Sequence, residues 1–352
     1  MTVLPKSARA ALAATTVMLT LAACGGGGSS SSGPADSSPA AEGAQGSTPV
    51  TLMLNWYPYG EHAPLYYGLK EGIFAEHGID LTIDGGQGST RTAQAVGGQQ
   101  VDFGWSDTAA VLSNIDQGVD IKSVGVFLQT TPSAVQVFAD SGIEEPSDLA
   151  GRTIAVSAGD APTTTFPMFL ADVGLTPDEV NQQNLDSAGK MAALLAGRVD
   201  GLIGFAHDQG PNLANKSGRE MRYFRYSDAG LNFFSNGLIA HSSTIENDPE
   251  LVQAMLDATS ESYAAAIENP EAAAAAMVGV DPQTPPENVL LEQWEQTIPL
   301  LSTPATEGKA PGTNAEEDWT STIKTLSDAG LLESAKDPSE YWASTFVPNG
   351  GQ

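Results

Sequence analysis

The sequence contains little cysteine and little histidine. Its only cysteine is Cys24, and four histidines are scattered along its 352 residues. A single cysteine excludes both an internal disulfide and a thiolate metal cluster, and four scattered histidines make a histidine-rich metal site improbable. We therefore expect no metal ligands and no cofactor.

Positive charge is also scarce. Lysine and arginine together number 15, against 43 aspartate and glutamate residues, which gives a net charge of −28. Such an acidic chain repels phosphate backbones, so nucleic-acid binding is excluded, and its folded surface is not expected to bind anionic lipid. Hydrophobic residues make up 41% of the chain, enough for a sizeable core, and the length suits roughly two domains.

No apolar run is long enough to cross a bilayer, which requires about 20 residues. The most apolar stretch covers residues 11–23 and follows a leader that contains Lys6 and Arg9. This arrangement is typical of a secretory signal. We expect residues 1–23 to form a signal peptide.

The apolar run ends in Leu-Ala-Ala-Cys followed by glycine, with Cys24 as the cysteine. This resembles the bacterial lipobox, in which the cysteine thiol receives a diacylglycerol and becomes the new N-terminus. The resemblance implies lipidation at Cys24 and a lipid-anchored protein on the extracytoplasmic face of the cell membrane. Residues 24–49 are rich in glycine, serine, alanine and proline, which predicts a flexible tether reaching roughly 25–30 Å.

Strand-like and helix-like segments alternate from residue 50 onward, which predicts an α/β fold with parallel neighbouring strands. The helices beyond residue 248 are expected to follow a strand that returns to the first part of the fold. Strands are expected at residues 50–54, 79–83, 101–105, 121–128, 134–139, 153–156, 199–204 and 237–240, and helices at 64–76, 90–97, 107–117, 163–173, 187–196, 249–268, 270–278, 287–298 and 315–329.

Ligands bind outside the carboxyl ends of the strands in open α/β sheets, so the loops after the strands are the candidate site. Trp56 and Phe205 offer flat faces for a planar ligand. The candidate ligand-binding residues from this reasoning are Asn55, Trp56, Tyr57, Tyr59, Gly88, Ser89, Ser106, Asp107, Gly159, Asp160, Thr163, Phe205, Asp208 and, near a chain crossing, Asn236.

Structural explanations compete with these assignments. Trp56 could belong to the core, Ser106 and Asp107 are ordinary helix N-caps, and the glycine-rich turn at residues 85–89 is as readily a connector as an anion site.

Three motifs within the globular part resemble type II periplasmic substrate-binding proteins of ABC importers. They are the segment at residues 54–79, the paired Gly-Gln-Gln-Val-Asp and Gly-Arg-Val-Asp segments at 98–102 and 197–200, and Asp-Leu-Ala-Gly-Arg-Thr-Ile-Ala-Val at 148–156. The resemblance implies two lobes with a ligand cleft between them and two hinge crossovers. We expect a first part of lobe 1 at residues 50–138, lobe 2 at 139–235 and the rest of lobe 1 at 236–352, with hinges near 138–141 and 234–237.

The opening segment narrows this resemblance to the branch that binds the pyrimidine precursor of thiamine. Trp56, Pro58, His62 and Tyr66 match its motif, whereas Asn55 and Tyr59 replace the usual aspartate and asparagine. The match adds His62 to the candidate ligand-binding residues, although a lone histidine near a helix start is more often structural.

This branch implies a small aminopyrimidine ligand whose edge pairs with Asp208 or Asp107, an ABC permease as partner, and a monomer. Riboflavin-type, sulfonate or taurine, and nitrate-like ligands are alternatives. A pyrimidine-synthase-like enzyme is a further alternative. Synthases of this fold carry a cysteine-rich iron motif that this chain lacks, so we expect no enzyme activity.

Overall fold

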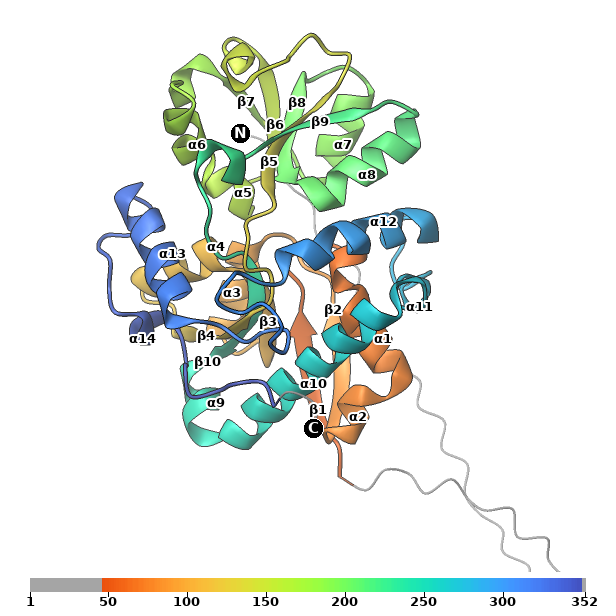
Figure 1. Ribbon diagram of the computed structural model, residues 1–352, viewed down its shortest axis with the longest axis vertical. Helices are drawn as coiled ribbons and strands as arrows, with labels where there is room; N and C mark the ends of the chain where they lie inside the picture. The colour runs from red at the N-terminus through yellow and green to blue at the C-terminus, as the bar shows by residue number, and fades with distance from the viewer. Residues whose placement is uncertain (1–45, 350–352) are drawn as a thin grey trace, which may run out of the picture. The chain divides into compact units, whose positions relative to one another are not determined.

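The computed structural model describes residues 46–349. The predicted signal peptide, the lipidation residue Cys24 and all but the end of the predicted tether lie outside these residues. Within them, the strands form two separate five-stranded sheets (Figure 1). The fold is α/β, as the sequence predicts.

The first sheet has the strand order β2-β1-β3-β10-β4. β1 pairs in parallel with β2 and β3, and β10 runs antiparallel between β3 and β4. The carboxyl ends of β1, β2 and β3 therefore lie at one edge of the sheet. The strands are β1 (Thr48–Met53), β2 (Ile79–Asp84), β3 (Phe103–Asp107), β4 (Ile121–Val126) and β10 (Asn236–His241).

The second sheet repeats this pattern with the order β7-β6-β8-β5-β9. β6 pairs in parallel with β7 and β8, and β5 runs antiparallel to β8 and β9. We call the part built on the first sheet lobe 1 and the part built on the second sheet lobe 2. The strands are β5 (Ser133–Phe138), β6 (Thr153–Val156), β7 (Asn181–Asn184), β8 (Gly201–Phe205) and β9 (Met221–Arg225).

The strand pairing corrects one expected lobe boundary. A first part of lobe 1 that ends at residue 138, as expected from the sequence, would place β5 in lobe 1. The structure pairs β5 with β8 and β9, so the chain crosses between β4 and β5, at residues 127–132, rather than at 138–141. The return crossing lies between β9 and β10, at residues 226–235, next to the expected position.

Helices connect the parallel strands and cover the sheets. One expected helix, residues 64–76, is interrupted at Gly72, whose φ of 83° ends the first helix in the left-handed conformation. The α-helices are α1 (Ala63–Glu71), α2 (Ile73–Glu76), α3 (Ser89–Gly97), α4 (Thr108–Asp116), α5 (Ala161–Thr164), α6 (Phe166–Asp172), α7 (Ser187–Leu195), α8 (Ala206–Ser217), α9 (Ser242–Asn247), α10 (Pro249–Glu268), α11 (Pro270–Ala276), α12 (Glu287–Thr297), α13 (Glu316–Asp328) and α14 (Pro338–Tyr341), and the 3₁₀ turns are η1 (Gly60–His62), η2 (Pro146–Leu149), η3 (Pro177–Glu179), η4 (Ser227–Ala229) and η5 (Ile298–Leu300).

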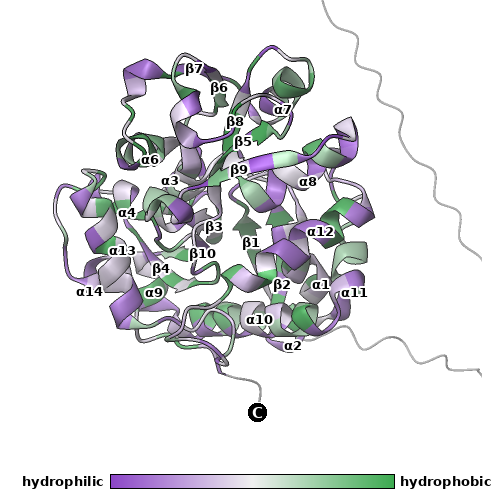
Figure 2. Cartoon of the chain, turned by 45° about the horizontal axis from the view of Figure 1, so that its top comes forward, coloured by the Kyte–Doolittle hydropathy of each residue, from purple (hydrophilic) through white to green (hydrophobic). Residues whose placement is uncertain are grey.

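The strands at the centre of each sheet are buried. Every residue of β5 and β8 is buried, and Figure 2 draws much of both strands in the green of hydrophobic residues. In lobe 1, Trp105 of β3 stacks on Tyr263 of α10 with ring centroids 5.5 Å apart. Within residues 46–349, no helix combines the length and apolar character needed to cross a bilayer.

Candidate functional site

A small enclosed cavity lies where the strand-end loops of both lobes meet. Its volume is only about 10 Å³. Seven of its eight lining residues are among those expected from the sequence, and Gln209 is the eighth. The lining residues are Asn55, Trp56, Tyr59, Ser89, Asp160, Phe205, Asp208 and Gln209.

A cavity of this size accommodates about one water molecule. A planar ring therefore enters only if the lobes move apart, and the structure represents a closed arrangement.

Trp56 lies in the loop after β1 and contacts a buried cation of lobe 2. The ammonium nitrogen of Lys190 lies 5.2 Å from the centroid of the Trp56 ring. Such a cation–π contact stabilises a desolvated ring by about 2 kcal/mol. The indole Nε1 of Trp56 is buried and has no hydrogen-bond partner among the described residues. It is therefore a buried donor without a partner in this part of the chain, on a residue that lines the cavity.

Asp160, in the loop after β6, forms an ion pair with Lys190 of α7. The Nζ–Oδ2 distance is 2.8 Å, and the Lys190 side chain is fully buried. Lys190 also donates to the carbonyl oxygen of Ile203 in β8 at 2.8 Å. A lysine buried this completely requires a partner charge, and Asp160 supplies it.

Asp208, in the first turn of α8, accepts hydrogen bonds from neutral groups on three elements. The Tyr57 hydroxyl donates to Oδ1 at 2.8 Å, and Gln293 of α12 donates to the backbone carbonyl at 2.7 Å and to Oδ1 at 3.3 Å. The neighbouring Gln209 donates to Oδ2. Burial raises the pKa of Asp208 to about 8, although the Tyr57 hydrogen bond and the charge of Lys190 lower it.

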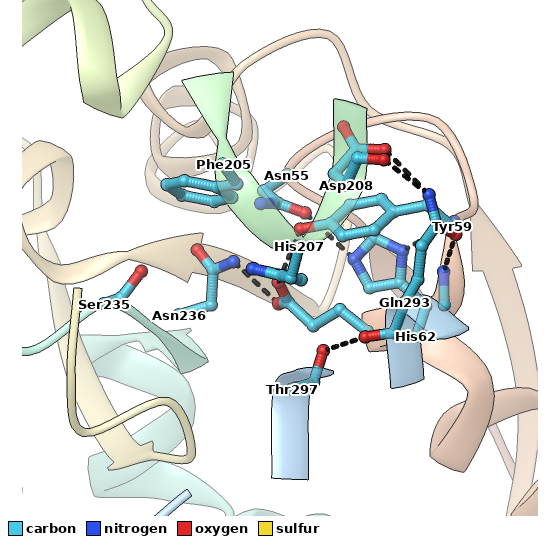
Figure 3. Close-up of polar contacts among 12 residues, drawn as sticks. Asn55, Tyr59, His62, Phe205, His207, Asp208, Ser235, Asn236, Gln293 and Thr297 are labelled. Atoms are coloured by element: carbon cyan, nitrogen blue, oxygen red, sulfur yellow. Dashed lines mark hydrogen bonds and ion pairs between the residues drawn. The ribbon is translucent and has the colours of Figure 1, made fainter. Parts of the chain in front are cut away.

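Glu61, which is not among the residues expected from the sequence, accepts four side-chain hydrogen bonds. Oε1 accepts from Trp105 Nε1 at 2.7 Å and from Asn236 Nδ2 at 2.6 Å. Oε2 accepts from the Tyr59 hydroxyl and from His207 Nε2, the latter at 2.9 Å. Figure 3 shows Asn236 and His207 directed toward the same carboxylate.

Burial alone would raise the pKa of Glu61, but the hydrogen bond and charge of His207 outweigh it and lower the pKa to about 2. The carboxylate stays ionised across the physiological range. Asn236, expected near the hinge, thus holds Glu61 and does not line the cavity.

His62 holds Asn55 rather than reaching the cavity itself. Its Nδ1 accepts from the backbone amide of Tyr59 at 3.4 Å, so its Nε2 carries the proton and donates to Asn55 Oδ1 at 2.9 Å. Burial lowers the pKa of His62 to about 4, against the charge of Glu61. A neutral His62 therefore fixes the Asn55 amide, whose oxygen points to His62 (Figure 3).

The expected pair Ser106 and Asp107 lies behind the cavity wall. Asp107 caps α4 by accepting from the amide of Ala109 at 2.9 Å, and it accepts from the Ser235 hydroxyl at 2.7 Å. Burial raises its pKa to about 7. Ser106 donates to the carbonyl oxygen of Ser89 at 3.1 Å. The alternative N-cap role therefore accounts for Asp107, and neither residue lines the cavity.

Gly88 and Gly159 bring the two lobes into backbone contact. A Cβ atom on Gly88 would lie 2.9 Å from the carbonyl oxygen of Gly159, and that oxygen accepts from the amide of Thr90 at 3.4 Å. Gly88 also has a φ of +121°. Thr163 lies apart from the cavity and accepts from the amide of Ser157 at 3.3 Å.

A larger groove of about 620 Å³ adjoins the cavity at Trp56, which lines both. Both lobes contribute to it, and its lining is rich in serine, asparagine and glutamine. The lining includes Tyr57, Gln87, Arg91, Ser157, Asn184, Ser187 and Gln283. The groove and the cavity thus lie on either side of Trp56.

Metal binding has no support from the side chains that the structure describes. Residues 46–349 contain no group of three or more histidine, cysteine, aspartate or glutamate side chains placed to hold a metal ion.

The comparison with known families gives one match that covers most of the chain. The profile of the family described as "NMT1/THI5 like" matches residues 60–273. A curated relative is the riboflavin-binding protein RibY of Chloroflexus aurantiacus, 24% identical over 89% of this chain and 91% of its own length. A formylaminopyrimidine-binding protein of Halalkalibacterium halodurans is 26% identical over 72% of this chain and 73% of its own.

Enzymes also occur among the relatives. The 4-amino-5-hydroxymethyl-2-methylpyrimidine phosphate synthase of Legionella pneumophila is 25% identical over 85% of this chain and 92% of its own. Among solved structures, the alkanesulfonate-binding protein SsuA of Xanthomonas axonopodis, bound to MOPS, superposes with a TM-score of 0.65 at 16% identity, over 86% of this chain and 99% of its own. This likeness shows the two-lobed periplasmic binding protein fold, as the sequence resemblance implied.

Proposed function

The chain belongs to the NMT1/THI5-like family, and from that membership and the geometry of the cavity we propose that it is the solute-binding protein of an ABC importer. Its ligand is a thiamine pyrimidine precursor, an aminopyrimidine that it delivers to the membrane permease. The observation that carries the proposal is the convergence of flat faces and hydrogen-bonding edges on one enclosed cavity, with Trp56 from lobe 1 and Phe205 and Asp208 from lobe 2.

The chemistry of the cavity suits an uncharged or weakly basic ring. Trp56 and Phe205 provide aromatic area for stacking. Asp160 and Asp208 provide oxygen acceptors, and the chain carries a net charge of −28, which opposes the approach of an anion. Two carboxyl groups, those of Asp160 and Asp208, line the cavity and disfavour a sulfonate or nitrate there.

Binding rather than catalysis is the second part of the proposal. The only cysteine of the chain is Cys24, inside the lipobox-like segment, so the cysteine-rich motif of the synthase branch has no counterpart here. Mass spectrometry of cells that express the protein without its signal peptide tests this part, with cells that express the Legionella pneumophila synthase as the positive control. We expect no additional aminopyrimidine phosphate from this protein, and an increase that depends on it would overturn this part.

The third part of the proposal is attachment to the membrane through a lipid on Cys24, which places a monomeric protein beside its permease on the extracytoplasmic face.

Calorimetric titration of the purified protein tests the ligand. The panel is 4-amino-5-hydroxymethyl-2-methylpyrimidine, its formylaminomethyl counterpart, riboflavin, taurine and nitrate. We expect the tightest binding with one of the two pyrimidines. Tight binding of taurine or nitrate without a response to either pyrimidine would overturn the proposal. Tighter binding of riboflavin than of either pyrimidine would also overturn the pyrimidine assignment and indicate a flavin ligand.

A further inference from the structure

The buried acids around the cavity differ in how their charge is compensated. Glu61 pairs with His207 at 2.9 Å, and Asp160 pairs with Lys190 at 2.8 Å. Asp107 lies at the start of α4, where the helix dipole and the amide of Ala109 stabilise its charge. Asp208 lines the cavity, and no salt bridge within residues 46–349 includes it.

The groups packed around Asp208 give it hydrogen bonds but no neutralising charge. Its direct donors, on the loop after β1, on α8 and on α12, are the uncharged side chains Tyr57, Gln209 and Gln293. The charged and titratable groups that act on it are Lys190 of α7, Glu61 of η1, Asp160 of the β6–α5 loop, and the hydroxyls of Tyr57 and Tyr59.

The two acids in this set oppose ionisation of Asp208 and the single lysine favours it, but Lys190 is already paired with Asp160. The first turn of α8 favours a negative charge, yet burial dominates and raises the pKa of Asp208 to about 8. Near neutral pH, this carboxyl therefore holds a proton when the lobes are closed.

We propose that Asp208 and the bound ligand share one proton, so that the ligand class is a weakly basic heteroaromatic amine with a ring nitrogen beside an N–H donor. This inference rests on the proposed function. One carboxyl oxygen accepts a hydrogen bond from the exocyclic amine, and the other shares its proton with the ring nitrogen. The proton passes only between oxygen and nitrogen, so the pair as a whole stays neutral and its burial leaves no uncompensated charge.

The shared proton couples binding to pH. The complex holds one proton between Asp208 and the ligand. At pH values above the pKa of Asp208 in the free protein and the pKa of the ring nitrogen in the free ligand, both groups lack it, so binding takes up one proton. Each further pH unit then weakens binding about tenfold, which is roughly tenfold between pH 8.5 and pH 9.5. An asparagine at position 208 carries a permanent N–H group in place of the shared proton and removes this dependence.

The experiment is calorimetric titration with 4-amino-5-hydroxymethyl-2-methylpyrimidine from pH 7 to pH 9.5, in buffers of different ionisation enthalpy, which counts the protons taken up. Wild type is expected to take up about one proton per ligand at pH 9. Asp208→Asn is expected to take up none and to bind equally at pH 8 and pH 9.5. Glu292→Gln is the matched control, because it removes an exposed acid next to Gln293 on α12 that lines neither the cavity nor the groove, and it is expected to keep the proton uptake of wild type.

Binding by wild type at pH 9 without proton uptake would overturn the shared proton and leave the proposed function intact. Absence of binding by any pyrimidine at pH 7 would instead overturn the proposed function. If Asp208→Asn does not fold, as judged by its thermal unfolding, the proton count on wild type alone decides between these outcomes.

Discussion

Glu61 of lobe 1 accepts a hydrogen bond from His207 of lobe 2, with 2.9 Å between Oε2 and Nε2, and neither side chain is more than 1% exposed. The same carboxylate accepts from Asn236, where the chain re-enters lobe 1. One buried acid therefore connects lobe 1, lobe 2 and the end of the return crossing.

The first prediction concerns this carboxylate. Glu61→Gln replaces a carboxylate oxygen that accepts two buried hydrogen bonds with an amide nitrogen that cannot accept them, so the variant is expected to lower the free energy of unfolding at pH 7 by about 3 kcal/mol. The pKa of Glu61 is lowered from 4.5 to about 2 on folding, so its contribution is complete above pH 4.5 and declines as the pH falls toward 2. Denaturant unfolding at pH 7, 4 and 3 measures the difference in unfolding free energy between the variant and wild type. This difference should shrink as the pH falls.

Glu71→Gln is the control for this prediction, because Glu71 is an exposed acid at the end of the adjacent helix α1. It is expected to change the stability by less than about 0.5 kcal/mol. Equal stabilities of the two variants at pH 7 would contradict the role of Glu61.

The second prediction concerns stacking by Trp56. Stacking of a base on an aromatic side chain contributes roughly 1–3 kcal/mol, so Trp56→Ala is expected to weaken pyrimidine binding about 5- to 150-fold. Calorimetric titration measures the change. Trp342→Ala is the control, because Trp342 stacks on Trp319 and lines neither the cavity nor the groove, and it should lower stability without changing affinity. An unchanged affinity in Trp56→Ala would rule out stacking.

The third prediction tests the backbone contact between the lobes. Gly88→Ala places a methyl group 2.9 Å from the carbonyl oxygen of Gly159 and imposes a φ of +121° on alanine. Overpacking of this kind costs roughly 1–3 kcal/mol, and because it acts only in the closed arrangement, affinity should fall about 5- to 150-fold.

Gly142→Ala separates this clash from backbone strain. Gly142 also has a positive φ, of 78°, but a Cβ atom there would meet nothing within 4 Å. Its substitution should lower stability and leave ligand affinity unchanged. Equal affinities of the two glycine variants would refute the idea that the Gly88–Gly159 contact belongs to the closed arrangement.

The fourth prediction concerns motion. Because the enclosed cavity holds only about 10 Å³, the lobes must separate before a ring can enter. The two crossings, at residues 127–132 and 226–235, are expected to act as the hinges. Small-angle X-ray scattering should show a smaller radius of gyration with saturating ligand than without it. The same radius in both states would indicate a rigid binder.

The fifth prediction concerns membrane attachment and depends on the sequence alone. Cys24→Ala is expected to release the protein from the membrane fraction or to halt its processing, because the thiol is the proposed site of the lipid. Fractionation followed by immunoblotting and intact mass measurement detects both outcomes. A variant that remains in the membrane fraction with its leader removed would exclude the anchor.

Much of the cavity could be predicted from the sequence because one topological rule governs it. Loops at the carboxyl ends of parallel strands meet at one edge of a sheet, so Trp56, Ser89, Asp160 and Phe205 could be named without coordinates. No such rule predicts which side chains form hydrogen bonds with the cavity residues. Gln293 reaches Asp208 from α12, 85 residues further along the chain, and no pattern in α12 indicates this contact.

Two other residues stand out in the sequence by their local context. Lys190 is a lone cation in a helix of otherwise uncharged residues, and it is buried while Leu195 of the same helix is 39% exposed. Glu61 is a lone acid among aromatic residues, at a position where burial requires several donors.

Among the strands, β7 (Asn-Gln-Gln-Asn) escaped prediction because all of its residues are polar. Its place at the edge of the sheet tolerates that composition.

The position of β10 in the first sheet also determines the order in which the lobes can be completed. All five strands of lobe 2 lie between residues 133 and 225, so its sheet can form as soon as that stretch is available. Lobe 1 lacks the strand that joins β3 to β4 until residues 236–241 arrive. A chain whose N-terminus emerges first, from a ribosome or across a membrane, is therefore expected to fold lobe 2 first. The sheet of lobe 1 is completed afterwards, when β10 becomes available.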